Sequence, residues 1–158
     1  MDDKNIPSKN IDEFSILRAN VQNLTSLHKL QHLELLLSRH ASDVCSLTET
    51  YLTNINRDLY KVKAYNVYHS TRDKYGGGVS CLVKTTIKSS EFKIPDNLLP
   101  SELVGEFLAI SLDGTTCVLT TYRTPTNNAS ISNKRAYLDA LTSIVEFLYN
   151  KHSCFCLW

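Results

Sequence analysis

Apolar and polar residues alternate along this chain with two periods, one typical of helices and the other of strands. Apolar residues recur every three or four positions in Leu27–His40 and again in residues 133–150, which predicts two helices with one buried face each. Short apolar runs around them predict strands. The expected strands are residues 15–21, 44–47, 65–70, 79–84, 102–112, 116–122 and 153–158. This order predicts an α/β domain that opens β-α-β.

Short signals between these elements predict how they connect. The Asp113-Gly114 dipeptide is a strong signal for a tight hairpin. The three glycines at 76–78 join strands 65–70 and 79–84, which we expect to form an antiparallel pair. Ser132 is the expected N-cap of the second helix. The expected buried stripes are Leu30, Leu33, Leu36, Leu37 and Ala41 in the first helix, and Leu138, Leu141, Ile144, Val145 and Leu148 in the second.

The composition is that of a soluble globular domain, with 42% hydrophobic and 21% charged residues in a chain of 158. No apolar run approaches the roughly 20 residues that span a bilayer, so we expect no membrane partner. Residues 1–13 are polar and are expected to form a flexible arm rather than a signal peptide. The net charge is only +1, so a nucleic-acid surface would have to be a local cluster of charge.

The five cysteines are odd in number and far apart, and each lies in an apolar, strand-like run. This pattern predicts buried free thiols in a reducing compartment, and hence an intracellular protein of the nucleus or cytoplasm. His152-x-Cys154-x-Cys156 would share one face of a strand, but its spacing matches no usual zinc site and no second ligand pair exists. His28 and His32 are four residues apart on a helix, where a solvated face is the favoured interpretation.

Polar side chains follow two of the predicted strands where each strand ends. Glu49 comes directly after the run at 44–47, and Asn20 ends the apolar run that begins at Ile16. A carboxylate at the mouth of a buried strand is well placed for a metal ligand, because a strand fixes its position better than a loop does. The glycines at 76–78 are not a phosphate-binding loop, since no Lys-Ser/Thr follows and they open a strand rather than a helix.

Four segments in series resemble the endonuclease/exonuclease/phosphatase superfamily. They are Arg18-Ala19-Asn20-Val21-Gln22-Asn23-Leu24, Leu47-Thr48-Glu49-Thr50-Tyr51-Leu52, Arg72 with Gly76-Gly77-Gly78-Val79, and Tyr122-Arg123-Thr124-Pro125. They are most similar to the apurinic-type endonuclease domain of non-LTR retrotransposons, whose motifs read W-N-x-x-G/S-L, L-T-E-T-W-L, R-x-x-x-x-G-G-G-V and Y-R-P-P. The match extends from residue 16 to 158, and the L-T-E-T-[WY]-L and G-G-G-V elements are its specific parts.

The resemblance implies two packed mixed β-sheets flanked by helices, a four-layer sandwich, and Mg²⁺-dependent (or Mn²⁺-dependent) hydrolysis of DNA phosphodiesters. DNA is the implied partner, and no small-molecule cofactor is expected. Glu49 would bind the metal, and Asn20 would lie near the metal and the scissile phosphate. Tyr122 would hydrogen-bond the phosphate or a neighbouring catalytic group, which makes these three the expected catalytic residues. Arg72 and Arg123 are weaker candidates for phosphate contacts.

The chain departs from the family pattern beyond its last strand. The family continues with G-D-F-N and, much later, with an acid and an S-D-H element, and none of these occurs here. The smaller departures are Ala19, Tyr51 and Thr124 in place of Trp, Trp and Pro. We therefore expect residues 14–158 to form an incomplete domain with little activity alone, since a positioned general base contributes roughly 10²–10⁴-fold.

Other interpretations remain open at this stage. Glu49 could be an ordinary exposed acid, Tyr122 could cover a sheet edge, and the Asn20 side chain could complete a local turn. The whole chain could be a catalytically inactive binding or scaffold remnant. It could also be a phosphatase or phosphodiesterase of the same superfamily that acts on lipid or inositol phosphates.

Overall fold

A computed structural model describes residues 14–71, 77–101, 104–125, 131–151 and, for the backbone alone, 153–157. The polar arm expected at residues 1–13 lies outside the described residues. The strands are β1 Ile16–Asn20, β2 Val44–Thr48, β3 Tyr65–Ser70, β4 Val79–Lys84, β5 Ser89–Phe92, β6 Gly105–Leu112, β7 Thr116–Arg123 and β8 Ser153–Leu157. The helices are α1 Leu27–His40 and α2 Ile131–Tyr149, with single 3₁₀ turns η1 Arg57–Leu59 and η2 Asp96–Leu98.

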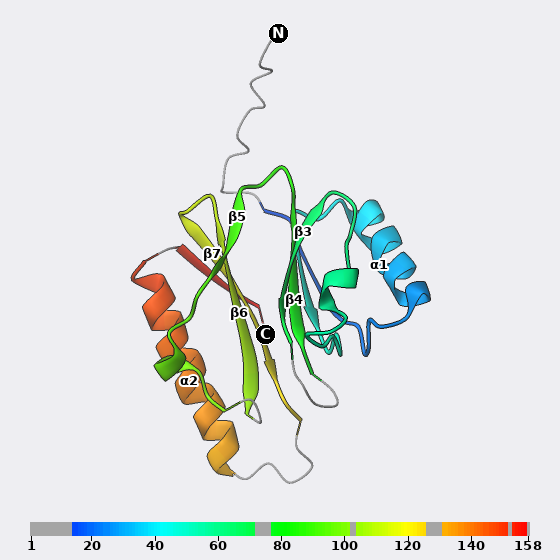
Figure 1. Ribbon diagram of the computed structural model, residues 1–158. Coiled ribbons are helices and arrows are strands. Elements are labelled where there is room, and N and C mark those ends of the chain that lie inside the picture. Colours follow the sequence, from blue (N-terminus) through cyan, green and yellow to red (C-terminus); the bar gives the residue numbers. More distant parts are fainter. Residues whose placement is uncertain (1–13, 72–76, 102–103, 126–130, 152, 158) are drawn as a thin grey trace.

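The strands form two sheets, and both are mixed. The first has the order β1-β2-β4-β3, in which β1 and β2 are parallel and the other pairs antiparallel. The second has the order β5-β6-β7-β8, in which β7 and β8 are parallel and the other pairs antiparallel. Each parallel pair is connected through a helix, which is the usual form of the long crossover that parallel strands need. The sheets pack face to face, with α1 and α2 on opposite outer sides (Figure 1).

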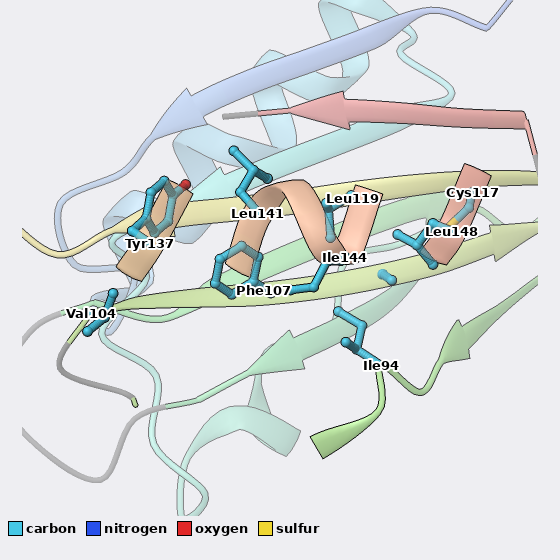
Figure 2. Close-up of a cluster of buried hydrophobic side chains, with 10 residues drawn as sticks. Ile94, Val104, Phe107, Cys117, Leu119, Tyr137, Leu141, Ile144 and Leu148 are labelled. Atoms are coloured by element: carbon cyan, nitrogen blue, oxygen red, sulfur yellow. The ribbon is translucent and has the colours of Figure 1, made fainter. Parts of the chain in front are cut away.

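Successive side chains of a strand point to opposite faces of its sheet, so the two sheets and two helices enclose three separate buried layers. The layer between α1 and the first sheet contains Leu24, Leu33, Leu37, Cys45, Leu47, Val62 and Leu82. The layer between the sheets contains Val44, Val79, Cys81, Val83, Ile87, Leu108, Ile110, Leu112 and Val118. The layer between the second sheet and α2 contains Ile94, Val104, Phe107, Ala109, Cys117, Leu119, Tyr137, Leu141, Ile144 and Leu148 (Figure 2). The predicted fold class, a four-layer α/β sandwich with two mixed sheets, is confirmed.

Helix α1 has the bounds that its periodicity predicted. Ser26 is its N-cap and accepts a hydrogen bond from the Lys29 backbone N–H, and Ala41 ends the helix in the left-handed conformation. Leu33 and Leu37 are buried, whereas Ala41 is exposed and does not belong to the expected stripe.

Helix α2 differs from its prediction at two positions. It begins at Ile131, so Ser132 lies in the first turn and is not the N-cap. Leu138 is 53% exposed, because the buried face is formed by Tyr137, Leu141, Ile144 and Leu148. Tyr137 occupies the position that the apolar pattern assigned to its neighbour, since its ring stacks on Phe107 and its hydroxyl lies 2.8 Å from Thr121 Oγ1.

The β6–β7 hairpin turns at Asp113 and Gly114, as predicted. Both residues have positive φ, 50° and 73°, which is the backbone of a type I′ turn. Strand β5 was not predicted, and it pairs with β6 at the edge of the second sheet.

A buried carboxylate aligns three strands of the first sheet at the end where β2 begins. Asp43 Oδ2 accepts hydrogen bonds from the Ser15 backbone N–H and hydroxyl at 3.0 and 2.8 Å. Lys84 at the end of β4 forms an ion pair with Asp43 Oδ1 at 3.1 Å. These bonds fix the register of β1, β2 and β4, and therefore the positions of the strand ends on the opposite side.

Within the described part of the chain, no helix is both long and apolar enough to span a bilayer.

Candidate active site

The layer between the sheets changes from apolar to polar towards one end of the sandwich. The inward-facing residues along this direction are Val44, Ser46 and Thr48 in β2, Val118, Thr120 and Tyr122 in β7, and Ile110, Leu108 and Glu106 in β6. Burying polar side chains inside a domain costs free energy unless they form hydrogen bonds. The polar groups gathered here define the candidate site.

Glu49 and Tyr122 meet at this end. The Tyr122 hydroxyl donates a hydrogen bond to Glu49 Oε1 at 2.7 Å, and both side chains are partly buried. Burial is the main cause that raises the pKa of Tyr122, followed by its hydrogen bond to Glu49 and the negative charge of that carboxylate. Tyr51 and Glu106 raise the pKa further. Tyr122 is therefore held as a neutral phenol that donates a hydrogen bond.

The backbone around Glu49 is held in an uncommon conformation. Glu49 and Tyr51 have φ values of 57° and 56°, in the left-handed region that non-glycine residues seldom adopt. On one side, the Asn23 N–H donates to the Glu49 carbonyl at 2.8 Å. On the other side, the Thr50 and Tyr51 N–H groups donate to the carbonyls of Gly78 and Gly77 at 3.2 and 2.9 Å. Strained residues of this kind are often found at functional sites.

Asn20 is the last residue of β1 and lies opposite Thr48 in the parallel pair. Ile16 packs between the sheets while Leu17 and Ala19 pack against α1, so alternation places Asn20 on the inter-sheet face. Its Oδ1 accepts a hydrogen bond from the Gln22 backbone N–H at 3.2 Å, which is the local turn considered from sequence. The strand ends of Asn20 and Glu49 are thus neighbours, but the described residues include no hydrogen bond between the two side chains.

A basic cavity adjoins Tyr122. Its volume is about 460 Å³, and its lining includes Arg18 of β1, Arg123 of β7 and Lys134 of α2. Three cations around one opening attract an anionic ligand. Arg72, the other arginine considered from sequence, lies outside the described residues.

The donors at the site fit a magnesium ion in part. Mg²⁺ keeps several waters and is commonly bound by one or two carboxylates together with substrate phosphate oxygens. The Glu49 carboxylate and the Asn20 amide oxygen are hard oxygen donors on adjacent strand ends, which suits this ion. No group of three His, Cys, Asp or Glu side chains that could hold a metal occurs among the residues that the structure describes.

One residue of the site, Glu106, was missed by the sequence analysis. It is only 6% exposed, and its Oε2 accepts a hydrogen bond from the Gly78 N–H at 2.6 Å. It lies directly opposite Tyr122 in the β6–β7 ladder. A signal existed, because Glu106 is the one charged residue in the strand Gly-Glu-Phe-Leu-Ala-Ile-Ser-Leu.

The cysteines do not take part in this site. Cys45, Cys81 and Cys117 are buried thiols that form no disulfide, as predicted. Burial raises the pKa of Cys45 and Cys81 to about 12, so both thiols stay protonated. The side chains of Cys154 and Cys156, and His152, lie outside the described residues. His28 and His32 are neighbours on α1, with ring centroids 4.1 Å apart and ring planes tilted by 56°.

The two packed mixed sheets flanked by helices form the fold of the nuclease and phosphatase class. The sequence profile of the Endonuclease/Exonuclease/phosphatase family matches residues 19–156. The chain belongs to this family. No curated protein matches the sequence.

Three solved structures illustrate the likeness in fold. The 3′ phosphatase NExo from Neisseria, bound to a product DNA hairpin, has 18% identity and a TM-score of 0.66 over 89% of this chain and 54% of its own. The D. rerio TDP2 complexed with a single-strand DNA product has 14% identity and a TM-score of 0.63 over 90% of this chain and 58% of its own. The AP endonuclease LMAP from Leishmania major has 18% identity and a TM-score of 0.61 over 87% and 48%. The chain therefore spans about half the length of these proteins, and at such identities the likeness concerns the fold alone.

Proposed function

We propose that this chain carries part of the active site of a Mg²⁺-dependent DNA endonuclease of the non-LTR retrotransposon type. The observation that carries the proposal is the 2.7 Å hydrogen bond from Tyr122 to Glu49. It joins a strand-end carboxylate and a neutral phenol at the polar end of the inter-sheet layer, beside Asn20. Activity of the whole protein belongs to the proposal as well, because the chain spans about half the length of the solved structures that it resembles.

Each residue has a role that follows from its chemistry. Glu49 would bind the metal through its carboxylate, and Asn20 would add an amide oxygen or orient the phosphate. Bound Mg²⁺ would supply positive charge to the phosphate oxygens. Tyr122, kept protonated, would donate a hydrogen bond where negative charge grows during hydrolysis.

The proposed substrate is DNA. Arg18, Arg123 and Lys134 line the cavity beside Tyr122 and could bind backbone phosphates on either side of the scissile bond. Two solved structures with the same fold contain DNA products. The retrotransposon subtype rests on the sequence motifs at 47–52 and 76–79. Residence in the nucleus or cytoplasm is part of the same proposal and agrees with three buried cysteines of the described part that form no disulfide.

Metal binding is the first test. Mn²⁺ is the probe, followed by electron paramagnetic resonance in the full chain. We expect one site, weakened at least about 10–100-fold by Glu49→Gln, which is the range seen when even an indirect metal partner is removed. Glu34→Gln is the matched control, because Glu34 is an exposed acid on α1. Equal Mn²⁺ binding by the wild type and Glu49→Gln would contradict the metal role of Glu49.

Activity is the second test, with nicking of supercoiled plasmid measured in Mg²⁺. A rate that falls about 10²–10³-fold in Glu49→Gln supports the endonuclease. Release of phosphate from a 3′-phosphorylated oligonucleotide or an inositol phosphate, without nicking, would favour the phosphatase alternative. Mn²⁺ binding at Glu49 with neither activity would indicate a scaffold that needs residues beyond this chain.

A further inference from the structure

Glu106 is a buried carboxylate without an obvious structural need. It is 6% exposed and lies on the inter-sheet face of β6, in line with Leu108 and Ile110. Burying a carboxylate costs several kcal/mol unless hydrogen bonds compensate. A leucine at this position would continue the apolar layer at no such cost. The position of Glu106 at the polar end therefore calls for another explanation.

One carboxylate oxygen of Glu106 holds the glycine turn. Its Oε2 accepts the Gly78 N–H at 2.6 Å, which is short even for a charge-assisted bond. Gly78 in turn accepts a hydrogen bond from the Thr50 N–H at 3.2 Å, and Thr50 follows Glu49 directly. Two hydrogen bonds thus link Glu106 to the segment that bears Glu49.

The glycine turn packs closely on Thr50. A Cβ atom at Gly78 would lie 2.5 Å from Thr50 Oγ1, and its φ of 84° is also in the left-handed region. The backbone of the turn therefore packs directly on Thr50. A displacement of Gly78 would act on Thr50 through this contact and through the hydrogen bond from the Thr50 N–H, and Thr50 is the residue directly after Glu49.

The other side of Glu106 adjoins Tyr122. The two residues are directly opposite in the antiparallel β6–β7 pair, both facing the space between the sheets. Glu106 therefore belongs to the sheet that carries Tyr122 and is hydrogen-bonded to the turn that supports Glu49.

We propose that Glu106 is a positioning residue that sets the distance between Glu49 and Tyr122 by anchoring the Gly78 turn of the first sheet to β6 of the second. It acts through the acceptor oxygen that receives the Gly78 N–H, and not as a ligand of the metal. The functional meaning of this anchor rests on the proposed role of Glu49 and Tyr122. The anchor itself is independent of that role.

Two substitutions separate the hydrogen bond from the carboxylate charge. Glu106→Gln keeps an acceptor oxygen at the same reach and removes the charge. Glu106→Met keeps the length of the side chain and removes the acceptor. Ile110→Val is the control for general loosening, because Ile110 lies on the same face of β6, four positions from Glu106.

The readout is the ¹⁹F resonance of 3-fluorotyrosine placed at position 122 in the full chain without metal. The chemical shift measured in Glu49→Leu is the reference for a Tyr122 hydroxyl that has lost its hydrogen bond to Glu49. We expect Glu106→Met to move the resonance more than halfway to that value, and Glu106→Gln and Ile110→Val to leave it near the wild type. We also expect Glu106→Met to weaken Mn²⁺ binding about 10–100-fold, the usual effect of losing an outer partner of a metal ligand.

Three results would overturn the proposal. They are an unchanged resonance in Glu106→Met, a loss in Glu106→Gln as large as in Glu106→Met, and an equal shift in Ile110→Val. Should Glu106→Met fail to fold, Glu106→Asp replaces it, because its shorter carboxylate keeps the charge but cannot reach Gly78. Absence of Mn²⁺ binding in the wild type would contradict the proposed function alone, since the metal-free resonance still decides the role of Glu106.

Discussion

The Tyr122 hydroxyl lies 2.7 Å from Glu49 Oε1, although 73 positions separate the two residues in the sequence. Glu49 follows β2 of the first sheet, and Tyr122 belongs to β7 of the second. The hydrogen bond therefore joins the two sheets at the polar end of the layer between them. It forms only when both sheets have their native register and packing, so it reports on the fold and on the candidate site together.

Tyr122→Phe removes this donor and keeps the ring. Because the pair is partly exposed, we expect a loss of about 1 kcal/mol in the free energy of unfolding, measured by urea denaturation. We expect hydrolysis to fall about 10²–10³-fold, since a donor aimed at developing charge is lost. Tyr68→Phe is the matched control, because its hydroxyl lies 2.9 Å from Ser89 Oγ, away from the site. An equal loss of hydrolysis in both variants would argue against a specific role for Tyr122.

Gly78→Ala tests the close contact beneath Glu49. The new Cβ would meet Thr50 Oγ1 at 2.5 Å in a residue whose φ is 84°. We expect a loss of about 2–4 kcal/mol in the free energy of unfolding, from backbone strain and overpacking together. Gly114→Ala has a similar φ of 73° but nothing within 4 Å of its Cβ, so it should lose only about 1 kcal/mol. Similar losses in the two variants would show that the Thr50 contact is unimportant.

Local patterns were sufficient for most of the elements. The periodicity of Leu27–His40 gave α1 its bounds, and Asp113-Gly114 gave the hairpin, because both signals act within a few residues. Strand β5 has the sequence Ser-Ser-Glu-Phe and no apolar alternation. It is a strand because it pairs with β6, and that partner could not be known from the segment itself.

The candidate site was predictable only where its residues stand at strand ends. Asn20 and Glu49 could be placed together because parallel neighbours end at the same edge of a sheet. Glu106 could not be placed in the same way, since its partner Gly78 is 28 positions away in the other sheet. The sequence shows a charged residue in an apolar strand, but it does not show which backbone N–H donates a hydrogen bond to that residue.

The buried face of α2 leads to a further prediction, because the apolar pattern of the sequence and the packing in the structure disagree about Leu138. Leu141 is 8% exposed and packs on the second sheet, whereas Leu138 is 53% exposed. We expect Leu141→Ala to lower the free energy of unfolding by about 2–5 kcal/mol. Leu138→Ala, the matched control on the same helix, should change it by less than about 0.5 kcal/mol. A large loss in Leu138→Ala would place the buried face of α2 where the apolar pattern first put it.

His69 introduces a dependence of stability on pH that does not involve the hydrogen bond between Glu49 and Tyr122. Its Nδ1 lies 2.7 Å from Ser80 Oγ across the β3–β4 pair. The pKa of His69 is lowered from 6.5 to about 4, mainly by burial and then by the positive charge of Arg57, while Asp58 opposes the change. The folded protein therefore holds this imidazole neutral where the unfolded chain would protonate it.

Because the unfolded chain binds the extra proton, stability should fall as the pH drops from about 6.5 to about 4, with no further contribution from His69 below that range. The loss should be about 1–2 kcal/mol, since solvent screens a partly exposed ring. Urea denaturation at successive pH values measures it. His69→Gln, which cannot titrate, should remove this part of the slope, whereas His40→Gln at the exposed end of α1 should keep it. Parallel slopes for the wild type and His69→Gln would show that carboxylates, and not His69, cause the acid sensitivity.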